Sequence, residues 1–386
     1  MDFSLSESER DLVGLCRDFA QQQIAPRAPL AWDEARCPTD LLREMGQLGL
    51  LGMLIPEEWG GIGMSTIGFV AAMEQIGLAD QSVAAAWQAH VTIGSLPLYL
   101  FGNDTQRERW LRPLAEGRAL GAFGLTEPDA GSDARGIRTR AEPREGGWLI
   151  NGRKTFISNA GTDMSFGVTL LARIGPDEDG PPRFGSFVVE KGTPGFETSK
   201  QKDKIALRVV QNAHITLDGV RVPESDRLQG ANSFKDTAKV LRMTRAGVAW
   251  MATGCARGAY EHALAYARQR EQFGRPIGGF QLVQDLLVRM LANVTSSACL
   301  CARLASLQEE GLAEDHHSAL AKAFCTVRMR EATGWARELL GGNGILLENH
   351  LGRFVADSEA IYSYEGTREI NTLIVGRAIT GLSAFV

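Results

Sequence analysis

The segment 362–386, YSYEGTREINTLIVGRAITGLSAFV, places one carboxylate, Glu365, between an aromatic residue and a glycine. Immediately afterwards Ile370, Leu373 and Ile374 recur at the spacing of one helix face. A carboxylate at such a junction can project into a cavity while the following helix anchors it. If the cavity is apolar, burial raises the pKa of the glutamic acid toward that of a useful proton acceptor. The segment therefore suggests a buried general base, and the alternative is an exposed Glu in a turn.

Length and composition describe an ordinary globular chain. Its 386 residues suffice for two or three packed units, and 44% of them are hydrophobic and 23% charged. The net charge of -5 leaves no basic stripe, which argues against nucleic acid as a partner. No apolar run reaches membrane-spanning length and acidic residues lie close to the N-terminus, so we expect a cytoplasmic protein without a targeting peptide or a membrane partner. The six cysteines form no Cys-x-x-Cys pair and the histidines are scattered, so we expect reduced core thiols and no metal site.

Helical patterns fill both ends of the chain. Ser6 and Glu9 can form a capping box ahead of an apolar stripe that runs to Ile24. The segment 71–99 is rich in small apolar residues, which suits closely packed helices. Beyond residue 233, long amphipathic patterns with short connections predict an antiparallel bundle, and one of its helices ends just before Gly341.

Residues 121–232 have a different pattern. Short β-prone runs are separated by Gly, Pro and Asp, which predicts a small antiparallel β-domain. The acidic and proline-rich run 177–182 is predicted to be a loop between two of its strands. We therefore expect an α+β chain with an all-α domain over 1–120, a β-domain over 121–232 and a helical bundle over 233–386.

Three further segments carry candidate binding residues. The run 123–133, FGLTEPDAGSD, is dense in turn formers, whose amides and hydroxyls can bind a planar heterocycle or a phosphate, or simply form a structural turn. In KTFISN, which starts at Lys154, regular strand alternation places Phe156 and Ser158 on one face. Arg270 can make bidentate contacts to a pyrophosphate and Phe273 can pack on adenine, although a surface Arg at a helix end is the alternative.

Together these four segments resemble the acyl-CoA dehydrogenases, flavoenzymes that desaturate acyl thioesters, and the likeness spans essentially the whole chain. It implies an acyl-CoA dehydrogenase-like fold with an N-terminal helical domain, a middle antiparallel β-domain and a C-terminal four-helix bundle, with FAD as cofactor. Glu365 would remove the α-proton while the β-carbon delivers hydride to flavin N5, giving a trans-2-enoyl thioester. Some family members carry the base on an earlier helix, where this chain has Thr244, which is not a carboxylate.

The resemblance also implies roles for individual residues. Flavin contacts would come from Phe123, Leu125, Thr126, Ser132, Phe156, Ser158, Thr367 and Glu369. A flavin bound mainly by a neighbouring subunit would be reached by Arg270, Phe273, Gln281, Glu338, Gly341 and Gly342. The chain is therefore expected to form a homo-oligomer, a dimer of dimers, that passes electrons to an electron-transfer flavoprotein.

Substrate contacts are implied for Ser132, Tyr364 and Gly366. Lys239, Arg242 and Arg245 follow one another at helical spacing, and this basic cluster is either a solvated face or a phosphate site. The phosphate would belong to an acyl-CoA or to the phosphopantetheine of an acyl-carrier protein.

Two segments, 376–381 and 205–208, look most like the glutaryl-CoA dehydrogenase branch. That branch holds the distal carboxylate of its substrate with an Arg, and this chain has Ala84 at the equivalent position and no Arg within 82–90. We therefore do not expect the decarboxylating reaction. It remains an alternative, as do an oxidase that passes electrons to oxygen, a dehydrogenase of carrier-bound acyl groups and a non-enzymatic assembly scaffold.

Overall fold

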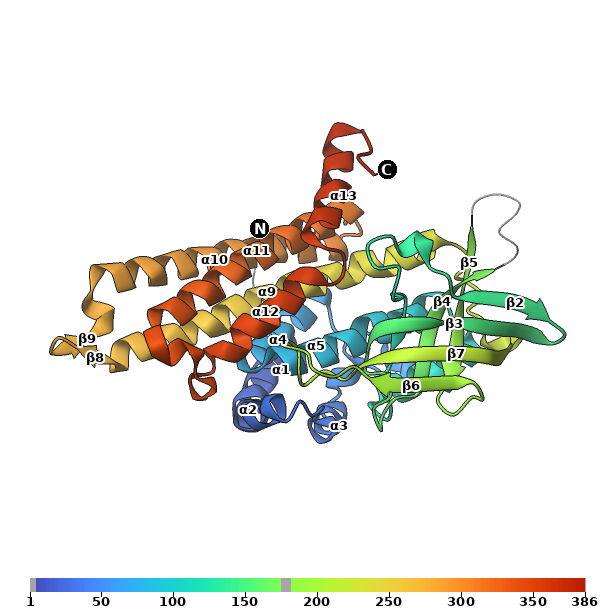
Figure 1. Ribbon diagram of the computed structural model, residues 1–386, viewed down its shortest axis with the longest axis horizontal. Coiled ribbons are helices and arrows are strands. Elements are labelled where there is room, and N and C mark those ends of the chain that lie inside the picture. Colours follow the sequence, from blue (N-terminus) through green and yellow to red (C-terminus); the bar gives the residue numbers. More distant parts are fainter. Residues whose placement is uncertain (1–4, 175–181, 386) are drawn as a thin grey trace.

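A computed structural model describes residues 5–174 and 182–385 of the chain. Figure 1 shows a β-sheet toward one end of the long axis and a bundle of long helices that extends to the other end, with the N-terminal helices packed between and below them. The predicted helix–sheet–helix order is confirmed. Most of the predicted loop 177–182 lies outside the described residues.

The first part of the chain is helical, as predicted. Ser6 and Glu9 form the expected capping box, in which each side chain accepts a hydrogen bond from the backbone of the other. Close helix packing follows from small residues: a Cβ atom at Gly254 of the long helix α9 (Phe234–Gln269) would lie 3.2 Å from the carbonyl oxygen of Glu74 in α4 (Thr66–Ala79). The elements are α1 (Glu7–Phe19), η1 (Ala20–Ile24), α2 (Ala25–Asp33), α3 (Thr39–Gln47), η2 (Leu50–Gly52), η3 (Glu57–Trp59), α4 (Thr66–Ala79), α5 (Gln81–Ala89), η4 (His90–Gly94), α6 (Leu96–Phe101), α7 (Asp104–Gln106), η5 (Arg107–Leu111) and α8 (Arg112–Ala115).

The middle part is a mixed sheet, so the prediction of an antiparallel β-domain is wrong in part. Strand β4 pairs in parallel with β1 and β2 along one edge and antiparallel with β5 along the other. The remaining pairs run antiparallel in the order β2-β3-β7-β6. The strands are β1 (Phe123–Gly124), β2 (Arg140–Arg144), β3 (Gly147–Ser158), β4 (Gly167–Ile174), β5 (Arg183–Glu190), β6 (Phe196–Lys200) and β7 (Asn212–Pro223).

The last part is the predicted bundle of long helices. Ser233 and Asp236 form a capping box at its start, and Gly341 adopts the left-handed φ of +58° just past the end of α11, as expected of a helix terminus. Figure 1 shows α13 projecting away from the body of the bundle. The elements are α9 (Phe234–Gln269), β8 (Glu271–Gln272), β9 (Arg275–Pro276), η8 (Ile277–Gly279), α10 (Gln281–Glu309), α11 (Asp315–Leu339), η9 (Gly341–Ile345), η10 (Leu347–Asn349), α12 (Leu351–Ser363) and α13 (Arg368–Thr380).

Helix α10 leaves many apolar side chains uncovered. Leu282 is 82% exposed and Val288 is 66% exposed. By length and composition alone, this helix is the one among the described residues that could cross a membrane, so the expectation that no such segment exists was wrong. A helix that packs on other protein passes the same test, and such exposed apolar residues are typical of a surface that another protein covers.

Candidate active site

A cavity of about 630 Å³ lies where the three parts of the chain meet. Its walls come from α5 and η4, the loop after β1, the end of β3, the segment 204–207, α9, and the turn between α12 and α13. The predicted site residues that line it are Phe123, Leu125, Thr126, Ser132, Phe156, Ser158, Arg245, Tyr364, Glu365, Gly366 and Thr367. Segments that are far apart in the sequence therefore converge on one space.

Glu365 occupies the turn between α12 and α13 with a φ of +57°. Residues other than glycine seldom adopt this left-handed conformation, so their surroundings must hold them in it. Arg245 Nε donates to the carbonyl oxygen of Glu365 at 3.1 Å. Lys322 Nζ donates to the carbonyl oxygens of Tyr362, at 2.7 Å, and Gly366, at 2.8 Å. Two cations thus fix the backbone before, at and after the carboxylate.

The helix after the turn is anchored by local sequence. The Thr367 side chain caps α13 by accepting from Ile370 N, and Asn371 Nδ2 donates to the carbonyl oxygens of Gly366, at 2.9 Å, and Thr367, at 3.0 Å. Asn371 is fully buried, whereas most of α13 is exposed. The turn is therefore rigid at both of its ends.

Burial raises the pKa of the Glu365 carboxyl group. Three groups oppose this rise: the Thr244 hydroxyl, which donates to Glu365 Oε2 at 2.8 Å, and the positive charges of Arg245 and Lys322. Burial also lowers the pKa of Lys322 to about 8. Glu365 is thus more basic than an exposed glutamate, and its donors limit the shift, which are properties that a general base requires.

A buried ion pair shapes the wall opposite. Lys154 Nζ lies 2.8 Å from Glu127 Oε1 and 3.1 Å from the carbonyl oxygen of Leu125. Thr155 N donates to the carbonyl oxygen of Thr126 at 2.9 Å. These bonds hold the loop after β1 against β3, so that Leu125 and Thr126 face the cavity.

Phe156 and Ser158 both line the cavity, but not because β3 alternates regularly. The pairing of β3 with β7 shifts its register between Lys154 and Ile157, and Phe156 has a φ of +59°. The prediction of regular alternation was therefore wrong, because a β-bulge re-aims the side chain. Phe156 is 61% exposed, so its ring offers an apolar surface on which a planar ligand could lie.

Six of the predicted flavin residues, Arg270, Phe273, Gln281, Glu338, Gly341 and Gly342, lie far from this cavity within one chain. Arg270 follows α9, and the 25 residues that separate it from Arg245 span about 38 Å of helix. Phe273 and Gln281 follow Arg270 at the same end of the molecule. The turn with Glu338, Gly341 and Gly342 lies there too, since Asn343 Nδ2 donates to Tyr266 Oη near the end of α9 at 2.7 Å. Figure 1 places β8 and β9 at the opposite end of the molecule from the sheet. Phe273 is 95% exposed there. Glu369 lies elsewhere, exposed at the start of α13.

The basic residues 239, 242 and 245 do not form one solvated cluster. Arg245 is buried and donates to Glu365, whereas Arg242 lies 3.8 Å from Asp315 and outside the cavity lining. Only Lys239 is fully exposed. The three residues therefore do not share one basic surface, and contact of any of them with a substrate phosphate stays a prediction.

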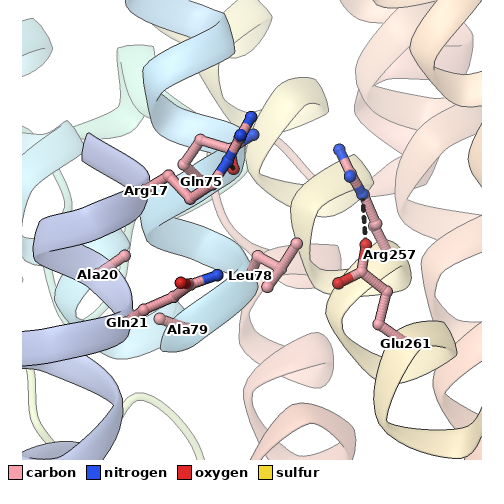
Figure 2. Close-up of a pocket in the computed structure, with 8 residues that line it drawn as sticks. All are labelled: Arg17, Ala20, Gln21, Gln75, Leu78, Ala79, Arg257 and Glu261. Atoms are coloured by element: carbon pink, nitrogen blue, oxygen red, sulfur yellow. Dashed lines mark hydrogen bonds and ion pairs between the residues drawn. The ribbon is translucent and has the colours of Figure 1, made fainter. Parts of the chain in front are cut away.

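A second cavity, of about 340 Å³, lies between α1, α4 and α9 (Figure 2). Its charged groups already have protein partners: Arg17 donates to Gln75, and Arg257 pairs with Glu74 and Glu261. Figure 2 shows the Arg257–Glu261 pair at its wall. Within residues 5–174 and 182–385, no group of three His, Cys, Asp or Glu residues could hold a metal ion. The larger cavity is therefore the candidate active site.

Comparison with known proteins agrees with this choice. The acyl-CoA dehydrogenase N-terminal, middle and C-terminal domains match residues 6–118, 122–220 and 234–380 of the chain. The chain belongs to the acyl-CoA dehydrogenase family. A probable acyl-CoA dehydrogenase of Bacillus subtilis, YngJ, is 35% identical over 98% of this chain and 100% of its own length.

Solved structures of acyl-CoA dehydrogenase relatives have the same fold. A glutaryl-CoA dehydrogenase from Mycobacterium smegmatis in complex with FADH2 superposes with a TM-score of 0.93 at 31% identity, covering 99% of this chain and 97% of that one. A structure described as an electron-transferring flavoprotein of Acidaminococcus fermentans contains a chain that matches with a TM-score of 0.94 at 31% identity, over 98% of this chain and 100% of that one.

Three residues of the acyl-CoA dehydrogenase site escaped sequence reasoning: Thr244, Lys322 and Gln88. Thr244 was noted only for lacking a carboxylate, although its hydroxyl bonds Glu365. Lys322 lies on the apolar face of a predicted helix, and a lysine in that position could have signalled a buried partner. Gln88 lines the cavity from α5 and had no distinguishing signal in the sequence.

Proposed function

We propose that this chain is an FAD-dependent acyl-CoA dehydrogenase that converts an acyl-CoA ester to its trans-2-enoyl ester, with Glu365 as general base. The observation that carries the proposal is a carboxylate in a strained turn, buried beside two cations, in the same cavity as Phe156, Ser158 and Thr126. A strained, buried, titratable group in a cleft is typical of a catalytic residue.

The lining fits a flavin. Phe156 presents an exposed ring, and Ser158 and Thr126 add hydrogen-bonding groups on the same wall, next to a turn-rich loop that reaches Ser132. An aromatic ring that is 61% exposed inside a cavity is unfavourable unless another apolar surface covers it. FAD, when bound, would accept the hydride that leaves the β-carbon of the substrate.

The other steps belong to residues of the chain. Glu365 would accept the α-proton, and its backbone amide would donate to the thioester oxygen, where negative charge develops. Thr244, Arg245 and Lys322 hold the carboxylate and its turn so that the base needs no reorganisation during the reaction. Exclusion of water from the cavity would strengthen these bonds.

We further propose a homo-oligomer in which the distal end of one bundle completes the flavin site of another subunit. The exposed Phe273, the uncovered face of α10 and the position of Arg270 support this arrangement. Replacing Arg270 with Ala should weaken FAD retention and leave the cavity of the same chain intact. A monomer that holds one FAD per chain at nanomolar concentration would contradict the proposal.

An acyl-CoA is favoured over an acyl-carrier protein as substrate. The residues expected to meet an acidic carrier do not form an exposed patch, since Arg245 is buried and Arg242 lies beside Asp315. We propose an electron-transfer flavoprotein as electron acceptor, in line with the family, and a cytoplasmic location, in line with the six free cysteines.

The deciding experiment is anaerobic titration of the purified protein with a panel of acyl-CoA esters. A yellow protein whose flavin absorbance bleaches with at least one ester supports the proposal. A colourless protein would favour the scaffold alternative, rapid oxygen consumption would favour an oxidase, and release of CO2 from glutaryl-CoA would favour the decarboxylating branch.

A further inference from the structure

Gln88 presents a hydrogen-bond acceptor to the cavity that the chain itself does not use. The residue lies on α5, is 4% exposed and lines the cavity. Its Nε2 donates to the carbonyl oxygen of Thr244 at 3.3 Å, and no described residue donates to its Oε1. The Oε1 atom is open to the cavity, and a ligand that covers it without offering a donor would leave it unpaired, so a donor on the bound ligand is expected.

The orientation of this amide is determined by its surroundings. If the two ends of the amide were exchanged, Oε1 would face the carbonyl oxygen of Thr244, and two acceptors would meet. Gly247, about one turn beyond Thr244 in α9, leaves room for the Gln88 side chain, because a Cβ atom at Gly247 would lie 3.1 Å from Gln88 Nε2. The Oε1 atom is therefore the end that remains for a ligand.

Gln88 is also close to the chemistry. Thr244 links Gln88 to Glu365, since its carbonyl oxygen accepts from Gln88 while its hydroxyl donates to Glu365 Oε2 at 2.8 Å. The amide is thus one residue away from the base that takes the α-proton. A group that reaches Gln88 must belong to the acyl part of the substrate near the reacting carbons.

Three other polar side chains that line the cavity have partners in the chain. Lys204 Nζ donates to two carbonyl oxygens and to Asn212, Ser363 Oγ donates to Glu359, and Arg245 Nε donates to Glu365. The charge around Glu365 is already positive on balance, because Arg245 and Lys322 flank one carboxylate. A cationic acyl group is disfavoured there, and an ionised carboxylate has no proton to donate to Oε1.

We propose that Gln88 is a specificity-determining residue that accepts a hydrogen bond from a hydroxyl group on the acyl chain, so that short hydroxylated acyl thioesters are the preferred substrates. This inference rests on the proposed function. The hydroxyl lies beyond the β-carbon, since the β-carbon loses hydride in the reaction and a hydroxyl there would not give a simple enoyl product. A site built to bond a hydroxyl discriminates against the analogue that lacks it, because its own acceptor is then left unpaired.

The test compares matched esters: butanoyl-CoA with 4-hydroxybutanoyl-CoA, and pentanoyl-CoA with 5-hydroxypentanoyl-CoA. We expect the wild-type kcat/KM to be about tenfold higher for the hydroxylated member of at least one pair, because the ester without the hydroxyl leaves the acceptor unpaired. The Gln88→Leu variant should lose this ratio. The control Gln81→Leu, on the same helix and 2% exposed but outside the cavity lining, should keep it.

A binding measurement on the wild-type protein tests the same preference without turnover and without the Gln88→Leu variant. Calorimetry with the products but-2-enoyl-CoA and 4-hydroxybut-2-enoyl-CoA should show the same preference in the wild-type Kd. Flavin bleaching by unsubstituted esters without any preference for hydroxylated ones, or a preference that survives in Gln88→Leu, overturns this inference and leaves the dehydrogenase function standing. Failure of every ester to bleach the flavin overturns both.

Discussion

Replacing Thr244 with Val tests whether the hydroxyl tunes the base. Thr244 is fully buried on α9, and its Oγ1 lies 2.8 Å from Glu365 Oε2 and 3.2 Å from the carbonyl oxygen of Leu241. The hydroxyl has one proton, and the shorter contact, to a charged acceptor, is the stronger bond. Valine has nearly the same shape as threonine but donates nothing, so the substitution removes this donor from the carboxylate.

The magnitude follows from the charge on the acceptor. A hydrogen bond to a charged group contributes about 1.5–3 kcal/mol, and one pKa unit corresponds to about 1.4 kcal/mol. Because the hydroxyl lowers the pKa of Glu365, its removal should raise that pKa. The base acts in its ionised form, so the acidic limb of the pH profile of kcat/KM should move to higher pH, by about one to two pH units if the whole bond is lost.

The assay is kcat/KM against pH for one good acyl-CoA substrate, between about pH 5 and pH 9. Thr253→Val is the matched control, since Thr253 is also fully buried on α9 and its hydroxyl donates to the carbonyl oxygen of Ala249 in its own helix. The control should leave the acidic limb in place. An unchanged limb in Thr244→Val, or a shift to lower pH, would refute the reasoning.

The remaining predictions concern three other side chains. Glu365→Gln should keep FAD and ligand binding but lose about two to four orders of magnitude in kcat, because the amide cannot accept the proton, and turnover near wild type would place the base elsewhere. Lys322→Met should lower both kcat and the Tm, since the carbonyl oxygens of residues 362 and 366 lose their donor. It should also move the acidic limb of the kcat/KM profile to higher pH, because Glu365 loses a nearby positive charge, and a wild-type pH profile would contradict this role. Burial lowers the pKa of His90 to about 4, so the unfolded chain binds a proton that the folded chain does not as the pH falls below about 6.5. The wild type should therefore lose about 2 kcal/mol of stability at this site between pH 7.5 and pH 5, and denaturant melts of His90→Gln should show a correspondingly smaller loss.

Helix and strand order could be predicted from the sequence because each depends on residues close together in the chain. The Ser6–Glu9 capping box and the left-handed Gly341 are local motifs, and both occur where the sequence placed them. The position of Glu365 at the start of a helix has the same origin, since Thr367 provides the cap three residues before Ile370. Periodicity and capping chemistry require no knowledge of the tertiary fold.

Strand partners and side-chain direction depended on contacts that no local pattern encodes. The parallel pairing of β4 with β1 and β2 joins segments separated by connections of many residues. The bulge at Phe156 interrupts the regular alternation of β3, although Phe156 and Ser158 still line the same cavity. Both were mispredicted because a strand sequence specifies which residues are apolar but not which strand lies beside it.

The site likewise combines residues that the sequence indicated with contacts that only the tertiary structure revealed. The resemblance of local sequence motifs to the family pointed to Glu365 and to the loops around it, and the structure brings these segments to one cavity. Only the tertiary structure brought Lys322 onto the carbonyl oxygens of residues 362 and 366, turned Arg245 inward, and placed the Gln88 amide one residue from Glu365. The physical reason is that burial and charge compensation arise between helices that meet only in the folded state, and they determine the pKa of Glu365.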